Sequence, residues 1–505
     1  MNLTRNDENH HIMNSKKGKI FSKENYYEYD VKNIKVDIFD DIFVSFEMNN
    51  DDYHDLIMYN GPHKKRDNEY YEKIPYSPEF KSITITCSFD DYEIELEDFI
   101  LIELFYDHEK IKSPKLSGTC SCCKLVNENN EIRDDEKVKI WDAYNEDFEI
   151  SNYFCQDFEN KHLKKISLIS ESNHCQLDED VKINLKKVFD EIKPNDWFIY
   201  QERKYEDYIK NHDDFIDNID LLLSFFTSKI KHHRMRVIET SDNKKIEIIF
   251  NSKNMYKLNG FTIFSPQPNT FMNFLDSSYE KVVELNESNF NIELLIQYYI
   301  WFKNEFYLDM RHLMGSIFLE TLIKQYYPNE KKKFAKKLKN ILEYKLNFNM
   351  YKIFNEFEKG LLSELETIKS SKLNESDERN INIVFKEFKG FFLIEILTKY
   401  RNKNVHSGEI KLDREDLKEI MKNTFIKTSK SLNGEKNKNV LKILCENKDQ
   451  LMESEYLNDL NTQNNVLENL MEIIILKLLN TNCGLLPNRI RQNVNSKEYI
   501  ESLSK

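Results

Sequence analysis

The chain has 505 residues, of which 40% are hydrophobic and 32% charged, with only 10 glycines and 9 prolines. This length is too great for one hydrophobic core, so we expect two or three folded domains. The net charge of −14 excludes binding to nucleic acid through overall charge, so any nucleic-acid site needs a local cluster of cations. The first 25 residues lack a secretory core, and the longest apolar run, Met471 to Leu479, is too short to span a bilayer. We therefore expect a cytosolic protein.

The first half of the chain has the alternating pattern of β-strands. Residues 1–30 are polar and predict a tail, whereas residues 31–105 alternate and contain a hairpin pattern around Asp90 and Asp91. The other elements expected in this half are strands near 147–154, 164–170, 234–240 and 245–250, and a helix near 204–230. We predict a β-rich domain over residues 31–270, with a sensor or recognition role.

The second half has helical periodicity. Ser265-Pro266-Gln267-Pro268 is the strongest linker signal, and the chain from 285 to 505 predicts helices throughout. The expected fold class is therefore α+β, in which a β-rich N-terminal domain is followed by an all-α helical bundle.

One motif in the helical half carries chemistry. Arg401 and His406 stand five residues apart at the end of a helix that is apolar around most of its circumference. An arginine can neutralise a phosphate, and a histidine can move protons near neutral pH. Asn402 and Asn404 are poor helix formers and Ser407-Gly408 follows, so we expect the helix to end or kink within the motif.

A second helix is expected directly after the motif. Asp413, followed three residues later by Asp416, is typical of a helix N-cap. The motif is thereby predicted to lie between two helices. On the residues alone, Arg401 and Asn402 are also compatible with an ordinary helix C-terminus, with His406 as a surface residue beyond it.

The pattern of Arg401, Asn402, a spacer and His406 resembles the signature of HEPN domains. Upstream, the run MRHLMGSIFLETL at 310–322 resembles the opening helix of HEPN domains of the ApeA type. The region before it, including IDLLLSFFTSK at 219–229, is similar to the β-rich N-terminal half of ApeA-like anti-phage proteins.

This resemblance implies a metal-independent endoribonuclease, a hydrolase of antiviral defence that acts by abortive infection. The 2′-hydroxyl of RNA would attack the adjacent phosphorus, leaving a 2′,3′-cyclic phosphate and a 5′-hydroxyl. His406 would act as general acid or base, Arg401 would stabilise the phosphorane, and Asn402 would orient the pair or contact the phosphate. The single motif implies a homodimer with a composite site, RNA as substrate, a phage-derived trigger and no cofactor for catalysis.

Two clusters supply further candidate residues. Lysines concentrate between Lys324 and Lys345 with helical spacing, which predicts a basic amphipathic helix that either contacts the RNA backbone or forms a solvated face. The candidate RNA-binding residues are Lys331, Lys332, Lys333, Lys336 and Lys337.

Four cysteines, Cys120, Cys122, Cys123 and Cys155, are candidate ligands of a structural zinc ion. Their spacing does not form two clean C-x-x-C pairs, so free thiols are the alternative.

Two other functions stay open. In one, the helical domain only dimerises and the β-rich half senses a phage component without catalysis. In the other, the chain resembles a CARF–HEPN ribonuclease gated by cyclic oligoadenylate. The polar start of the chain and the lack of a Rossmann-type opening strand with a glycine turn argue against the latter.

Overall fold

The computed structural model describes most of the chain in two compact units. One unit comprises Met1–Asp217 and His232–Lys257, and the other comprises Asn218–Lys231 and Leu258–Lys505. The described residues are 4–5, 11–22, 28–38, 41–49, 51–53, 83–105, 114–127, 132–144, 156–160, 164–170, 197–228, 233–252, 268–329, 333–357, 365–370, 378–407, 412–452, 460–481 and 496–504. For a few of these, including 404–407, the backbone alone is described.

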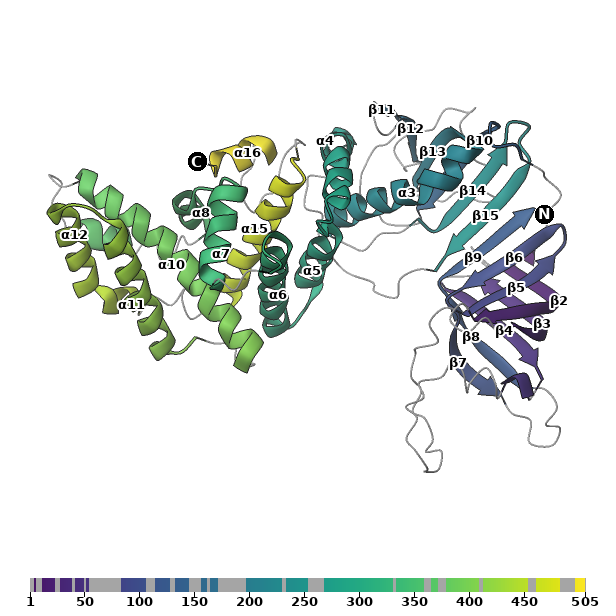
Figure 1. Cartoon of the computed structure of the whole chain (residues 1–505), viewed down its shortest axis with the longest axis horizontal. Coiled ribbons are helices and arrows are strands. Elements are labelled where there is room, and N and C mark those ends of the chain that lie inside the picture. The colour runs from purple at the N-terminus through teal and green to yellow at the C-terminus, as the bar shows by residue number, and fades with distance from the viewer. Residues whose placement is uncertain are drawn as a thin grey trace, which may run out of the picture. The chain divides into compact units, whose positions relative to one another are not determined.

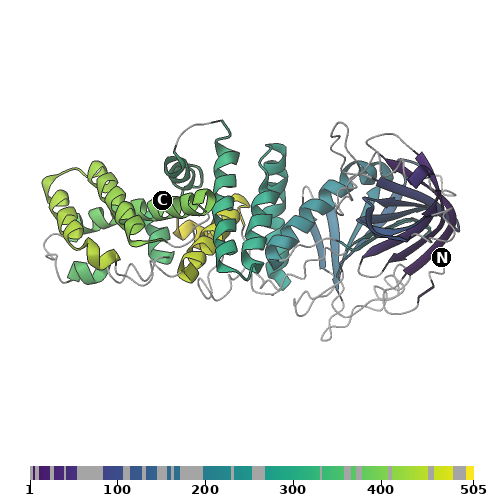
Figure 2. The same cartoon turned by 90° about the horizontal axis from the view of Figure 1, so that it is seen from below.

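The N-terminal unit is built on one curled antiparallel sheet (Figures 1 and 2). Its strands are β1 (Thr4–Arg5), β2 (His11–Ser22), β3 (Glu28–Ile38), β4 (Ile42–Met48), β5 (Ile83–Phe89), β6 (Tyr92–Glu97), β7 (Ile100–Phe105), β8 (Lys115–Cys120), β9 (Cys122–Asn127), β10 (Lys137–Tyr144), β11 (Gln156–Asn160), β12 (Lys164–Ser170), β13 (Trp197–Lys204), β14 (Met235–Thr240) and β15 (Lys245–Asn251). Across the sheet they follow the order β11, β12, β13, β10, β14, β15, β9, β6, β5, β2, β3, β4, β8 and β7, with β1 paired to β2.

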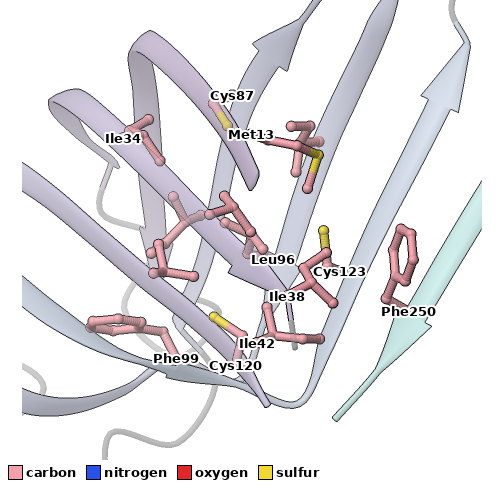
Figure 3. Packing of buried hydrophobic residues seen from close by; sticks show 14 of the residues in the cluster. Met13, Ile34, Ile38, Ile42, Cys87, Leu96, Phe99, Cys120, Cys123 and Phe250 are labelled. Atoms are coloured by element: carbon pink, nitrogen blue, oxygen red, sulfur yellow. The ribbon is translucent and has the colours of Figure 1, made fainter. Parts of the chain in front are cut away.

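The main core of this unit lies on one face of the sheet. In β4 every second side chain is buried, because successive side chains of a strand point to opposite faces. The buried side chains form one apolar cluster that extends from Met13 on β2 through Leu96 on β6 to Phe250 on β15 (Figure 3). Burial of this shared face therefore stabilises strands that are far apart in the sequence.

A helix covers part of the opposite face. α3 (Tyr205–Thr227) packs Tyr208 against Val138 and Ile140 of β10 and against Ile238 and Ile246 of the β14–β15 hairpin. The predicted helix near 204–230 and the strands at 234–240 and 245–250 are confirmed by α3, β14 and β15.

Of the three remaining strand predictions, two are confirmed and one falls outside the described residues. The hairpin is confirmed, because Phe89 pairs with Tyr92 around Asp90 and Asp91, and Asp90 adopts the left-handed φ of 50° that such turns use. The strand at 164–170 is confirmed as β12, whereas the one at 147–154 lies outside the described residues.

The polar tail predicted for residues 1–30 is wrong for His11–Ser22, which form β2 between β3 and β5. Met13 and Ile20 are buried, while Lys16 and Lys17 are exposed. A strand with one solvated side needs few apolar residues. For this reason the polar composition of the segment did not predict a strand.

The second unit is helical, which confirms the predicted α+β class. Its helices, with the further part of α3, are α4 (Pro268–Glu287), α5 (Ile292–Asn304), α6 (Leu308–Tyr326), α7 (Phe334–Asn340), the π-helix η1 (Ile341–Lys345), α8 (Met350–Phe357), α10 (Glu378–Ser407), α11 (Arg414–Ser431), α12 (Glu435–Glu446), α13 (Lys448–Met452), α15 (Leu460–Leu478) and α16 (Ser496–Ser502). No helix of the described part is long and apolar enough to cross a bilayer.

The second unit begins earlier than the predicted boundary at 285. α4 already starts at Pro268, and the end of α3 belongs to this unit because Phe225 packs on Phe274 of α4 and on Tyr299 of α5. These aromatic contacts bury Phe225 in the C-terminal part of α3.

α10 is central to the second unit, with α6, α7, α8, α11 and α12 packed around it (Figure 1). Close approach of α6 to its neighbours depends on Gly315. A Cβ atom there would lie 3.0 Å from Leu467 of α15 and 3.2 Å from Phe302 of α5. Even an alanine at 315 would require these two side chains to shift by a few tenths of an ångström.

Candidate active site

The Arg401–His406 motif lies within a helix. α10 continues to Ser407, so the predicted end or kink inside the motif is wrong. The buried stripe of α10 extends through Leu397 and Tyr400, and such tertiary packing outweighs the low helix propensity of Asn402 and Asn404. On this continuous helix, positions 401 and 406 are about 140° apart around the axis. The side chain of His406 is outside the described residues.

Arg401 is held by three neighbours. Its Nη2 forms an ion pair with Glu320 of α6, and its Nη1 donates a hydrogen bond to Asn402 Oδ1 at 3.0 Å. The guanidinium carbon lies 5.3 Å from the ring centroid of Phe334 at the start of α7. The Arg401 side chain is 16% exposed, so a partly desolvated cation reaches the surface in a defined orientation.

The residue before Arg401 is anchored by a buried histidine. Tyr400 meets His312 of α6 edge to face, with ring centroids 4.6 Å apart. Asn464 donates its Nδ2 to the carbonyl of Leu308, so its Oδ1 accepts a hydrogen bond from His312 Nδ1 at 3.0 Å. This arrangement places the imidazole proton on Nδ1 and connects α6, α10 and α15.

The imidazole of His312 is neutral at physiological pH. Burial lowers its pKa to about 4, because the protonated ring would lose its hydration. Its Nε2 has no hydrogen-bond partner among the described residues.

The predicted cap of the following helix is confirmed. Asp413 and Asp416 form a capping box at the start of α11. Both carboxylates also bind Lys403 of α10. Burial raises the pKa of Asp416, but hydrogen bonds from Lys403, the Asp413 backbone and Lys399 outweigh this and lower the pKa to about 2. Lys403 is therefore paired with carboxylates and is a poor candidate for phosphate binding.

The lysine cluster is only partly placed beside Arg401. Lys333 directly precedes Phe334, whose ring contacts Arg401, and both Lys333 and Lys336 are exposed. Lys337 is 8% exposed, so it lies on the buried side of α7. Lys331 and Lys332 lie outside the described residues. The predicted basic amphipathic helix is observed over residues 334–345 as α7 followed by η1, in which Leu338, Ile341 and Leu342 are buried.

The cysteine cluster forms part of the apolar core. Cys120 and Cys123 are buried in the cluster of Figure 3, where burial raises the pKa of both thiols. Cys122, adjacent to Cys123 on β9, faces the other side of the strand, and burial raises its pKa to about 12. Cys155 lies outside the described residues, and those that are described contain no group of three or more metal-ligating side chains.

Sequence reasoning missed Glu320 and His312 as neighbours of the motif. Both belong to the run MRHLMGSIFLETL, where Glu320 is an acidic residue inside an otherwise apolar turn. That placement was a usable signal, because a carboxylate on the apolar side of a helix needs a partner. The partner itself is 81 residues away in sequence.

Comparison of the chain with family models, curated proteins and solved structures finds no match.

Proposed function

We propose that the chain is a metal-independent HEPN-type endoribonuclease that acts as a homodimer in anti-phage defence. The observation that carries this proposal is the setting of Arg401. Its guanidinium is fixed between Glu320 and the Phe334 ring, and its side chain is 16% exposed. The exposed Lys333 and Lys336 stand one residue before and two residues after Phe334 in the sequence. Such locally placed cations are what an acidic chain needs to bind a phosphate.

In the proposed reaction, the 2′-oxygen of a ribose bonds to the adjacent phosphorus and the 5′-oxygen leaves. A base takes the proton of the 2′-hydroxyl, and an acid gives a proton to the departing oxygen. His406 serves one of these roles, worth about 10²–10⁴-fold in rate. Arg401 stabilises the charge on the phosphorane, and phosphate binding draws its guanidinium away from Glu320.

The helical geometry favours two copies of the chain at each site. Positions 401 and 406 are about 140° apart around the axis of α10, so we expect one protomer to present only one of these two residues to a given phosphate. Two motifs facing each other across a two-fold axis supply an arginine from one copy and a histidine from the other. Two imidazoles can then share the base and acid roles.

The test is cleavage of an RNA oligonucleotide by the purified protein in the presence of EDTA, with the product ends identified. Wild type should leave 2′,3′-cyclic phosphate ends, and His406→Ala should lower the rate about 10²-fold or more. Arg379→Ala is the matched control, because Arg379 is an exposed arginine near the opposite end of α10. RNA cleavage by His406→Ala at the wild-type rate would refute the proposal.

A cellular experiment covers the case in which a phage trigger is needed for activity. Sequencing of cut RNA ends in infected cells should show new ends with wild type and none with Arg401→Ala. If the wild-type protein produces no cut RNA ends either when purified or in infected cells, the non-catalytic binding function replaces the nuclease function.

A further inference from the structure

The N-terminal unit contains a pocket that the proposed nuclease reaction does not use. It has a volume of about 290 Å³ and lies between the first turns of α3 and the strands β9 and β15. Its polar lining comes from Tyr205, Tyr208 and Asp213 of α3, Lys124 and Asn127 of β9 and Glu247 of β15. This volume is near the lower end of the range of small-molecule pockets.

A β-bulge directs Glu247 into the pocket. Ile238 pairs with Glu247 and Glu239 pairs with Lys245, so Ile246 is an extra residue on β15. As a result, the adjacent residues Ile246 and Glu247 both line the pocket. Bulges of this kind often re-aim a side chain beside a functional site.

Glu247 is buried and held in place. It is 5% exposed, it accepts a hydrogen bond from the Tyr208 hydroxyl at 2.8 Å, and it pairs with Lys124 Nζ at 2.5 Å. Burial and the charge of Glu247 together raise the pKa of Tyr208 well above its ordinary value. Tyr208 is therefore a permanent donor, and the carboxylate keeps lone pairs for a ligand.

A buried charge network supports the second carboxylate of the pocket. Asp142 is fully buried and binds Arg236 Nε at 2.6 Å and His212 Nε2 at 3.0 Å. Arg236 also donates its Nη1 to Asp213 Oδ1 at 2.6 Å. The Asp213 side chain is 82% exposed, so the network fixes an accessible carboxylate at the edge of the pocket. Burying such charges is costly, and they gather at functional sites.

We propose that this pocket binds a small planar heterocycle with N–H donors and no phosphate, such as a free nucleoside. The rings of Tyr205 and Tyr208 stack on each other at 27° with centroids 6.0 Å apart, and both residues line the pocket, so a planar ligand ring can extend this stack. The N–H groups of the ligand would donate to Glu247 and Asp213. Two carboxylates against one ammonium group in the lining disfavour an anion.

Equilibrium dialysis of the full-length protein tests this proposal with adenosine, guanosine, cytidine and uridine as probes. Wild type should bind at least one of them, and the matching 5′-monophosphate should bind about tenfold more weakly. Glu247→Gln should weaken binding about tenfold, and Tyr205→Ala about fivefold or more. Asp213→Asn should also weaken binding, and it is the mildest of these variants for the fold because the exposed Asn oxygen can still accept the hydrogen bond from Arg236.

The matched control is the Tyr200–Glu202 pair on β13. Its hydroxyl–carboxylate hydrogen bond is 2.6 Å long and lies outside the pocket, so Tyr200→Phe and Glu202→Gln should bind like wild type. The proposal is overturned if wild type binds no nucleoside, if the monophosphate binds as tightly, or if the control and pocket variants behave alike. The His406→Ala protein should bind nucleoside normally, which separates this test from that of the nuclease.

Discussion

At the residue scale, the proposed reaction depends on the Arg401 guanidinium. Arg401 is paired with Glu320, whose side chain is 23% exposed. In the proposed reaction a phosphate competes with this carboxylate, so Glu320 would both orient the arginine and restrain it.

The two roles of Arg401 can be separated by comparing Arg401→Ala with Glu320→Ala. Both variants break the ion pair and should lose a similar stability, with a coupling of about 1 kcal/mol in a double-mutant cycle. Because only Arg401 would contact phosphate, Glu320→Ala should keep far more RNA cleavage activity. Equal loss of cleavage in the two variants would show that the pair serves packing alone.

His312 predicts a pH dependence of stability. Burial lowers its pKa from 6.5 to about 4 in the folded protein, so the unfolded chain binds more protons between these values. The stability contributed by the neutral imidazole is present above pH 6.5 and is lost as the pH falls toward 4. From about pH 7 to about pH 5, wild type should lose about 2 kcal/mol through this group.

Melting temperatures of wild type and His312→Gln over this pH range check the prediction. The variant should be less stable near neutral pH, because Gln does not reproduce the packing of the ring on Tyr400, and its stability should fall less steeply with acid. Parallel pH profiles for the two proteins would contradict a contribution from His312.

At the element scale, the connection between α10 and α11 holds the motif in place. Lys399 and Lys403 of α10 both bind the capping carboxylates of α11. The last turns of α10, which contain the motif, are therefore tied to the first turn of the next helix.

Asp413→Ala should destabilise the second unit by about 1 kcal/mol through loss of the N-cap. Glu415→Ala is the control, since Glu415 lies in the same first turn, is exposed and takes no part in the capping box. Urea unfolding followed by circular dichroism measures both variants. If the two variants lose a similar free energy of unfolding, the capping box stabilises the helix only through its negative charge near the helix N-terminus.

At the scale of the whole molecule, the proposal needs two chains. Sedimentation should show a particle of twice the 60.8 kDa of one chain. Excess His406→Ala protein, allowed to exchange subunits with wild type, should lower cleavage because mixed dimers lack one imidazole. The same excess of Arg379→Ala should leave cleavage unchanged. A monomer that cleaves RNA at full rate would contradict the composite site.

Much of the architecture could be predicted from local patterns, because alternation and helical periodicity report which side of each element is buried. These patterns correctly predicted α3, β14, β15 and the helical second unit. They did not predict the strand at His11–Ser22, because most of its residues are polar and few of its side chains are buried. They also failed at Asn402, where packing carried α10 past residues that disfavour a helix.

The sequence by itself determined the fold class, the capping box at Asp413 and the spacing of Arg401 and His406, because these depend on residues close together in the chain. Only the tertiary structure decided that Arg401 meets Glu320, and that Tyr208 and a bulged strand place Glu247 in a pocket. Such contacts join residues distant in sequence, and no local pattern encodes which partner the packing of helices and strands will select.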